Sequence, residues 1–197
     1  NYGVHKNEIE SDDMKIAGLI CKNFNLNFSR AAANESLREY FIRQEKVVLS
    51  DIDTRSVVRH IRDKGAMNAI ISSSEMDINV LKDELSNVPS MEGLELSSFV
   101  TTEQPYFCGD ENAKYKIAVL DLGVKKNILR CLVDRDCYLK VFPMSTSYDT
   151  MCEWNPDGFF LSNGPGDPSS LHSVIEETRK IINDGRAVFG ICLGPVS

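Results

Sequence analysis

Apolar residues follow two different rhythms along this chain, and the second half carries the more regular one. Four short runs there are apolar nearly throughout, as strands buried on both faces of a sheet are: residues 117–121, 138–142, 158–162 and 187–191. Three intervening segments repeat apolar residues at the spacing of one helical face: residues 124–136, 147–153 and 169–184. The alternation of such strands and helices predicts a parallel sheet covered on both faces.

The first half predicts a mixed α and β unit. Its predicted strands are residues 17–21, 47–52 and 67–72, and its predicted helices are residues 36–44, 54–64 and 77–88. Gly65 is expected to end the second helix, because glycine is favoured just past helix C-termini. Asp77 is expected to cap the third helix, because its carboxylate can accept the free N–H groups of the first turn. Pro89 forbids a longer third helix.

Residues 101–115 separate these two patterns. The segment has no periodicity and carries Pro105, Gly109 and a polar run, which is typical of a linker between domains. The sequence therefore predicts an N-terminal domain over residues 1–100, a linker over residues 101–115 and a second domain over residues 116–197.

Composition and charge narrow the class of protein. The 197 residues carry a formal net charge of −7, and no block of Lys and Arg stands out, which argues against binding to nucleic acid or to anionic membranes. No apolar run approaches the ~20 residues that span a bilayer. The six cysteines form no Cys-x-x-Cys pair, so metal-ligand spacing is absent, and we expect reduced thiols in a cytoplasmic protein.

The last predicted strand ends in a cysteine between two glycines, Gly190-Ile191-Cys192-Leu193-Gly194. That pattern is typical of a nucleophile elbow, a sharp strand-to-helix turn that exposes one side chain at the end of a sheet. Glycines tolerate the crowding of such a turn and any positive φ angle it needs, and the N–H groups of a following helix favour a thiolate. A buried structural cysteine is the alternative, and the flanking glycines favour the nucleophile.

A loop rich in glycine and proline follows the preceding predicted strand, Ser162-Asn163-Gly164-Pro165-Gly166-Asp167-Pro168. Its rigid, extended backbone can point N–H groups into the crevice at the strand ends, where open α/β sheets bind their ligands. Such preorganised N–H groups stabilise an oxyanion. An ordinary β-to-α turn is the alternative, and the cysteine elbow one βα unit later favours the functional interpretation.

These two motifs together resemble those of class I glutamine amidotransferases. Four further stretches are similar to the small, glutamine-hydrolysing subunits of carbamoyl phosphate synthetase: Asn1-Tyr2-Gly3-Val4, Asp51-Ile52-Asp53-Thr54-Arg55, Asp121-Leu122-Gly123-Val124-Lys125-Lys126-Asn127-Ile128-Leu129-Arg130 and Asn155-Pro156-Asp157-Gly158. The resemblance runs over essentially the whole chain up to Gly194, and the Asp-Ile-Asp-Thr-Arg stretch distinguishes this family from other amidotransferases. It implies a mixed β/α N-terminal domain followed by the first half of a Rossmann- or flavodoxin-like amidotransferase domain.

The resemblance implies an enzyme that hydrolyses L-glutamine and delivers ammonia to a large synthetase subunit for carbamoyl phosphate synthesis, in arginine and pyrimidine biosynthesis. By motif match Cys192 is the nucleophile, the N–H groups of Leu193 and Gly164 stabilise the oxyanion, and Gly164 and Gly166 hold the glutamine. No cofactor or metal is expected in this chain, because ATP and Mg²⁺ belong to the large subunit.

Part of the family's site has no counterpart in this sequence. The family's elbow continues with His-Gln, whose glutamine contacts the substrate, whereas Pro195-Val196-Ser197 stand here. No His or Glu follows Cys192, so the general base and its supporting glutamate are missing, and none of the three histidines matches the base: His5, His60 and His172. An N-terminal segment that supplies a serine to the family's glutamine site is also missing. We therefore expect a chain truncated at both ends and inactive, or nearly so.

Two other interpretations stay open. One is a non-catalytic module that binds the large subunit. A basic row on one helical face, Arg55, Arg59 and Arg62, supplies a grip for it, although a solvated face paired with nearby aspartates is the simpler interpretation of the row: Asp51, Asp53 or Asp63. The other is an amidotransferase for a different acceptor, such as an anthranilate synthase partner, which requires the Asp-Ile-Asp-Thr-Arg stretch to be coincidental.

Overall fold

The computed structural model describes residues 3–11, 13–65, 67–90 and 93–192. The chain forms two compact units, Asn1–Met91 and Glu92–Ser197. Among the described residues, no helix is both long enough and apolar enough to cross a membrane.

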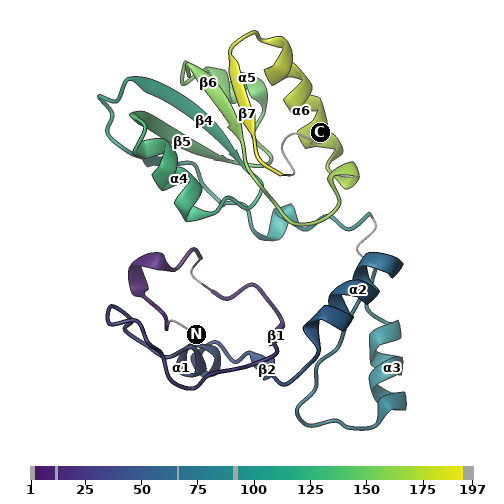
Figure 1. Ribbon diagram of the computed structural model, residues 1–197. Helices are drawn as coiled ribbons and strands as arrows, with labels where there is room; N and C mark the ends of the chain where they lie inside the picture. Colours follow the sequence, from purple (N-terminus) through teal and green to yellow (C-terminus); the bar gives the residue numbers. More distant parts are fainter. Residues whose placement is uncertain (1–2, 12, 66, 91–92, 193–197) are drawn as a thin grey trace. The chain divides into compact units, whose positions relative to one another are not determined.

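The second unit is built on a five-stranded sheet in the order β3-β5-β4-β6-β7 (Figure 1). Its strands are β3 (Tyr106–Cys108), β4 (Tyr115–Asp121), β5 (Cys137–Pro143), β6 (Gly158–Leu161) and β7 (Ala187–Gly190). Strands β4 to β7 run parallel, and β3 runs antiparallel beside β5 at one edge. Numbered along the chain, the parallel strands lie in the order 2-1-3-4, which is the flavodoxin-like order. The predicted α/β fold with a parallel sheet is confirmed. Strand β7 is the outermost strand and, contrary to the prediction of burial on both faces, is exposed: Val188 and Phe189 are 36% and 62% exposed.

Helices cover both faces of the other parallel strands, β4, β5 and β6. They are α4 (Lys126–Val133), α5 (Tyr148–Cys152) and α6 (His172–Asn183), with short 3₁₀ turns η2 (Ser97–Phe99) and η3 (Pro168–Ser170). Leu129 of α4 packs on one face with Val119 and Phe160, whereas Met151 of α5 and Ile181 of α6 belong to the core on the other face. Adjacent residues of one strand therefore enter opposite cores, which explains why the strands are apolar throughout.

The helices of this unit begin later than their apolar pattern predicts. The backbone N–H groups of Gly123 and Val124 are taken by the carboxylate of Asp121, so α4 begins at Lys126 rather than at residue 124. Asp167 caps the 3₁₀ turn η3, and α6 begins only after it. In both places a local side-chain hydrogen bond holds the backbone in a turn before the helix.

Residues 101–115, predicted as a linker, contribute to the second unit. Strand β3 pairs with β5 through Tyr106 opposite Val141 and Cys108 opposite Leu139. The hydroxyl of Thr101 donates to the backbone carbonyl of Asp121, 2.6 Å away. A three-residue strand on a sheet edge is too short to show a periodic pattern, so the sequence alone does not reveal it.

The first unit holds a two-stranded parallel sheet, β1 (Gly18–Ile20) and β2 (Val47–Leu49). Its helices are α1 (Leu37–Arg43), α2 (Thr54–Lys64) and α3 (Ile78–Ser86), with a 3₁₀ turn η1 (Lys6–Glu8). Ser36, Asp53 and Asp77 cap the three helices with their side chains. The predicted Asp77 cap is therefore confirmed, and Gly65 ends α2 as predicted.

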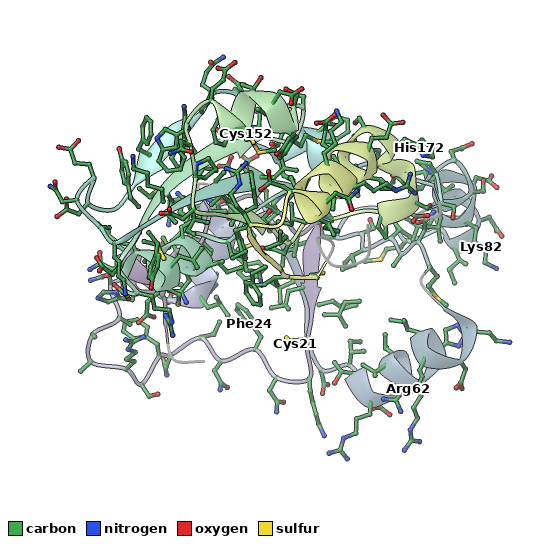
Figure 2. All side chains as sticks on the ribbon, turned by 90° about the horizontal axis from the view of Figure 1, so that it is seen from above. Cys21, Phe24, Arg62, Lys82, Cys152 and His172 are labelled. Carbon is green, nitrogen blue, oxygen red and sulfur yellow. The ribbon has the colours of Figure 1, made fainter. Side chains whose placement is uncertain are left out.

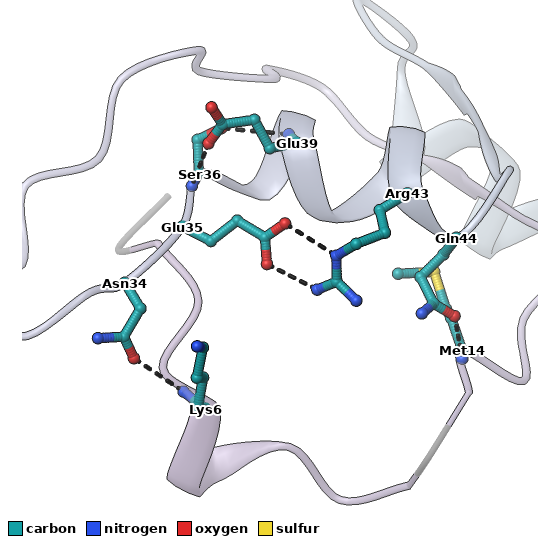
Figure 3. A network of polar contacts seen from close by, with 8 residues as sticks. All are labelled: Lys6, Met14, Asn34, Glu35, Ser36, Glu39, Arg43 and Gln44. Carbon is teal, nitrogen blue, oxygen red and sulfur yellow. Dashed lines mark hydrogen bonds and ion pairs between the residues drawn. The ribbon is translucent and has the colours of Figure 1, made fainter.

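Polar contacts tie the chain around α1 (Figure 3). Ser36 and Glu39 form a reciprocal capping box, in which each satisfies an N–H group at the helix start. Glu35 and Arg43 form a two-point ion pair, with Nη2 and Oε2 2.7 Å apart. These contacts fix the start and the outer side of α1, whose Phe41 is buried.

Residues 67–72 form no strand, so this prediction is wrong. The segment lies beside β1 through side chains: a Cβ on Gly18 would be 3.2 Å from Ile71 Cδ1. Its backbone does not join the β1–β2 ladder, and Met67 and Ile70 stay 43% and 38% exposed. A short apolar run is typical of a strand but does not supply the neighbouring strand that a ladder requires.

A polar corner at the amino-terminal ends of β6 and β7 joins three elements of the second unit. Arg186, directly before β7, forms an ion pair with Asp184, donates to the Pro156 carbonyl at 3.0 Å and lies 3.0 Å from Cys152 Sγ. The Tyr148 hydroxyl donates to the carboxylate of Asp184. The Arg186 guanidinium also stacks 4.9 Å from the centre of the Phe159 ring, so the cation has hydrogen-bond acceptors around its edge and an aromatic ring against its face.

These contacts shift the pKa of each partner. The hydrogen bond with the Arg186 guanidinium, followed by that from Tyr148, lowers the pKa of Asp184 below its ordinary value. The Asp184 carboxylate raises the pKa of Tyr148 to about 12. The corner is therefore strongest with Asp184 ionised and Tyr148 protonated, which holds throughout the neutral range.

We predict that Asp184→Asn destabilises the second unit in a pH-dependent way. Because the folded pKa of Asp184 is lowered, its stabilisation is complete above the ordinary aspartate pKa of about 4 and disappears as the pH falls through the lowered value. The difference in unfolding free energy between the original chain and the variant should therefore be constant from neutral pH down to about pH 5, narrow as the pH falls through the ordinary aspartate pKa of about 4, and be lost below the lowered folded pKa.

Urea unfolding followed by the fluorescence of Trp154, the single tryptophan, measures this difference. Asp134→Asn is the matched control, since Asp134 is exposed at the end of α4. A gap for Asp184→Asn that does not narrow on acidification would show that the charge is not the stabilising feature.

Candidate functional site

Three segments meet at the carboxyl ends of β4, β6 and β7. They are residues 122–123 after β4, residues 162–167 after β6 and residues 191–192 after β7. Strand β6 pairs in parallel with both β4 and β7, so the three segments leave the sheet at the same edge. The β4–β6 boundary is also where successive connections run to opposite sides, the place where open α/β sheets bind their ligands.

Cys192 occupies a sharp turn directly after β7. The Ile191 N–H still donates to Leu161 O at 3.1 Å, continuing the pairing with β6, and then Cys192 adopts φ 60° with an exposed side chain. A left-handed backbone angle costs a non-glycine residue about 1–2 kcal/mol. An exposed residue with a left-handed backbone angle directly after a strand is one feature of a nucleophile elbow, and here that residue is the cysteine. Leu193 and Gly194 lie outside the described residues.

A buried serine joins the ends of β4 and β6. The Ser162 hydroxyl accepts the Leu122 N–H at 2.8 Å and donates to the Asn163 carbonyl at 2.8 Å, while its own N–H donates to Leu120 O. The Asn163 side chain donates to Gly123 O at 2.9 Å and accepts the Lys125 N–H at 3.4 Å. The start of the glycine-rich loop is therefore held to the turn after β4.

Gly164 is required by the close approach of this loop to β4. A Cβ on Gly164 would overlap the Leu122 carbonyl oxygen and lie 2.9 Å from Leu122 Cβ, although its φ is not positive. Within the described part of the chain, the Gly164 N–H donates to no protein acceptor. Gly164 thus combines a fixed position with an open donor, which is what an oxyanion site needs.

Gly166 is restricted by a different neighbour. It adopts φ 93°, and a Cβ there would lie 2.7 Å from Leu94 O. Gly166 also forms an isolated antiparallel bridge with Glu95. Packing alone accounts for this glycine, and its expected contact with glutamine stays a prediction.

The carboxylate of Asp121 organises the turn after β4, and sequence reasoning missed it. Asp121 is only 4% exposed. One of its oxygens accepts the N–H groups of Gly123 and Val124 at 2.9 and 2.8 Å, and the other accepts the Thr102 N–H at 2.8 Å. An aspartate two residues before a glycine at a strand end is a signal for such a turn, but the contact with Thr102 has no local signal.

The histidines and arginines singled out in the sequence lie in other places. His60 is exposed on α2, and His172, exposed at the first residue of α6, is labelled in Figure 2. His5 precedes the 3₁₀ turn η1, and its side chain makes no capping hydrogen bond. The expected pairing of the α2 arginines with aspartates is not found: within the described ranges, Arg55, Arg59 and Arg62 form no ion pair, and Arg62 extends away from the helix (Figure 2).

No group of three or more His, Cys, Asp and Glu side chains among the described residues is arranged to hold a metal ion. The first unit contains an open apolar cavity of about 310 Å³. Its lining residues are Phe24, Leu26, Arg38, Phe41, Ile42, Lys46 and Val48, and none of them belongs to the predicted site.

Comparison with known proteins gives a consistent picture along the chain. Residues 1–71 match the family described as carbamoyl-phosphate synthase small chain, CPSase domain, and residues 118–195 match glutamine amidotransferase class-I. The chain is 37% identical over 210 residues to the carbamoyl phosphate synthase small chain of Pectobacterium atrosepticum, and 37% identical over 207 residues to that of Neisseria gonorrhoeae. Each alignment covers 98% of this chain and 55% of the relative, so the chain spans about half the length of these curated relatives.

We predict that Asp121→Ala destabilises the second unit by about 2–4 kcal/mol, because three partly buried backbone N–H groups lose their acceptor. Asp121→Asn should also destabilise it, since the amide NH₂ would face a backbone N–H donor. Urea unfolding monitored through Trp154 measures both effects.

The control is Asp134→Ala, at an exposed aspartate directly after α4, for which we expect a change within about 0.5 kcal/mol. An Asp121→Ala variant as stable as this control would refute the organising role of the buried carboxylate.

Proposed function

Since the chain belongs to the carbamoyl-phosphate synthase small-chain family, we propose that its second unit carries the glutamine-hydrolysing site of a carbamoyl phosphate synthase. The observation that supports this most directly is the pairing of two features on adjacent strands. Cys192 is strained and exposed after β7, and the open Gly164 N–H follows β6. A nucleophile beside a preorganised donor is the arrangement that acyl transfer requires.

The chemistry assigned to the site is hydrolysis of the glutamine side-chain amide. The Cys192 thiolate attacks the amide carbon and forms a C–S bond, while the carbonyl oxygen takes up the negative charge. The N–H groups of Gly164 and Leu193 receive that charge. The C–N bond then breaks, ammonia leaves with one added proton, and water cleaves the thioester to glutamate and regenerates the thiol. Gly164 and Gly166 border the bound glutamine.

In this proposal the ammonia passes to a large synthetase subunit, which uses ATP, Mg²⁺ and bicarbonate to make carbamoyl phosphate for arginine and pyrimidine synthesis in the cytoplasm. No cofactor is assigned to this chain. The match of residues 1–71 to the synthase small-chain domain supports this acceptor over an anthranilate synthase partner.

A second candidate function is docking to the large subunit without catalysis. The observation that favours it is the basic row of α2, defined by Arg55, Arg59 and Arg62, which forms no ion pair with any residue that the structure describes. Exposed apolar side chains lie on the same helix, with Val58 53% and Ile61 43% exposed. The reactivity of Cys192 separates the two candidates, because docking makes no demand on it.

We predict that a glutamine analogue with a chloromethyl ketone in place of its side-chain amide alkylates Cys192 selectively. The thiolate displaces chloride at the carbon next to the ketone, and the amino-acid part is held as glutamine would be. Iodoacetamide, which has no amino-acid part, gives the reference ratio of the alkylation rates of Cys192 and Cys131, the other exposed cysteine. With the analogue, this ratio should be at least about tenfold higher. Mass spectrometry of the digested protein measures both rates.

Cys192→Ala controls for labelling elsewhere, and the D-enantiomer of the analogue controls for recognition of its amino-acid part. If the analogue prefers Cys192 over Cys131 no more than iodoacetamide does, that result contradicts the glutamine site and favours docking. With L-glutamine itself, we expect these 197 residues to release ammonia no faster than the Cys192→Ala variant, because the sequence has no His or Glu after Cys192 to act as general base.

A further inference from the structure

Residues 93–97, here called the strap, lie beside the glycine-rich loop of residues 162–168. The Gly93 N–H donates to Asp167 Oδ2 at 2.9 Å, and the Asp167 N–H donates to Leu94 O at 3.1 Å. The Ser97 hydroxyl donates to Pro165 O at 3.3 Å. These three hydrogen bonds join the strap and the loop, although their sequence positions differ by about seventy residues.

The other carboxylate oxygen of Asp167 ties the same loop to the turn before α6. Asp167 Oδ1 accepts the N–H of Ser169 at 2.9 Å and its hydroxyl at 2.7 Å. The Ser170 hydroxyl donates to the Asp167 carbonyl at 2.6 Å. These hydrogen bonds, with that from Gly93 the strongest, lower the pKa of Asp167, so the carboxylate is ionised at neutral pH and accepts on both oxygens.

The strap is itself anchored to the site. Ser97 is fully buried, and the Thr101 N–H donates to its carbonyl at 2.9 Å. Thr101 in turn donates its hydroxyl to the carbonyl of Asp121, the residue that orders the turn after β4. The strap therefore connects the end of the loop at Asp167 to the end of β4 at Asp121, where the start of the loop is held.

Gly164 lies between two restraints. On its N-terminal side, Asn163 binds the turn after β4; on its C-terminal side, Pro165 and Asp167 bind the strap. Glycine has few backbone restrictions, so a Gly-Pro-Gly segment needs both ends fixed to keep one N–H direction. Donors at a reacting oxygen must be held within about 0.5 Å of the productive position.

We propose that Asp167 is a positioning residue of the glutamine site, whose carboxylate latches the loop to the strap and so aims the Gly164 N–H at the substrate carbonyl. This role rests on the proposed function, because it acts on glutamine through Gly164. Asp167 itself contacts neither the substrate nor Cys192 in this role.

The test compares Asp167→Asn with the original 197-residue chain. Asparagine still accepts from Ser169, but its NH₂ group faces the Gly93 N–H, so only the strap contact is lost. The readout is the rate of Cys192 alkylation by the glutamine chloromethyl ketone divided by its rate with iodoacetamide. We expect this ratio to fall about tenfold or more, as a fraction of the 10²–10³-fold effect of deleting an oxyanion donor, while the iodoacetamide rate changes less than twofold.

Asp157→Asn is the matched control. Asp157 also accepts a backbone N–H, that of Lys116 at 2.8 Å, but lies before β6, at the opposite edge of the sheet from Gly164. Its ratio should not change. The unfolding curve from Trp154 fluorescence establishes that each variant is folded, and if Asp167→Asn is not, Ser97→Ala carries the test by freeing Pro165 O alone.

Three results decide the matter. A lowered ratio in folded Asp167→Asn or Ser97→Ala, with an unchanged ratio in Asp157→Asn, supports the latch. An unchanged ratio in folded Asp167→Asn, or in Ser97→Ala where Asp167→Asn does not fold, overturns the latch and leaves the proposed glutamine site intact. An original chain that shows no preference for the glutamine reagent overturns the proposed function and this role with it.

Discussion

The buried carboxylate of Asp121 is the constraint on which the second unit depends. It ends β4 inside the protein, where an ionised group is tolerated only if its oxygens are satisfied by hydrogen bonds. Gly123, Val124 and Thr102 supply those bonds. In doing so they delay the start of α4, shape the turn after β4 and bring the segment that follows the strap onto the sheet. The local order of the site follows from this one satisfied charge.

The glycine-rich loop takes its place from that turn. Asn163 binds Gly123 O, and the absence of a Cβ lets Gly164 lie against the Leu122 carbonyl. Because β6 and β7 are adjacent and parallel, the loop and the Cys192 elbow leave the sheet at one edge. The polar corner of Arg186 and Asp184 lies at the other edge and has no part in this chemistry. The fold thus separates a stabilising edge from a reactive edge.

Much of this arrangement could be predicted from the sequence, for identifiable physical reasons. Residues 118–121 of β4 and all of β6 are buried, so their apolar runs are unambiguous, and α2 has the predicted bounds because Asp53 and Gly65 mark its ends. The elbow and the loop carry closely spaced glycines, and few other turns at the end of a strand require them. The predicted strand over residues 67–72 is wrong because an apolar run does not supply a pairing partner. The strap and the Thr102–Asp121 contact were missed because hydrogen bonds between distant residues leave no periodic trace.

The central claim is that the edge formed by Gly164 and Cys192 binds glutamine. Titration of the ¹⁵N-labelled chain with L-glutamine, followed by backbone amide NMR, tests it most directly. If glutamine binds there, L-glutamine should produce saturable shifts at Gly164, Gly166 and Cys192 that are absent with D-glutamine. Shifts confined to the apolar cavity around Phe41, or none at this edge, would contradict it.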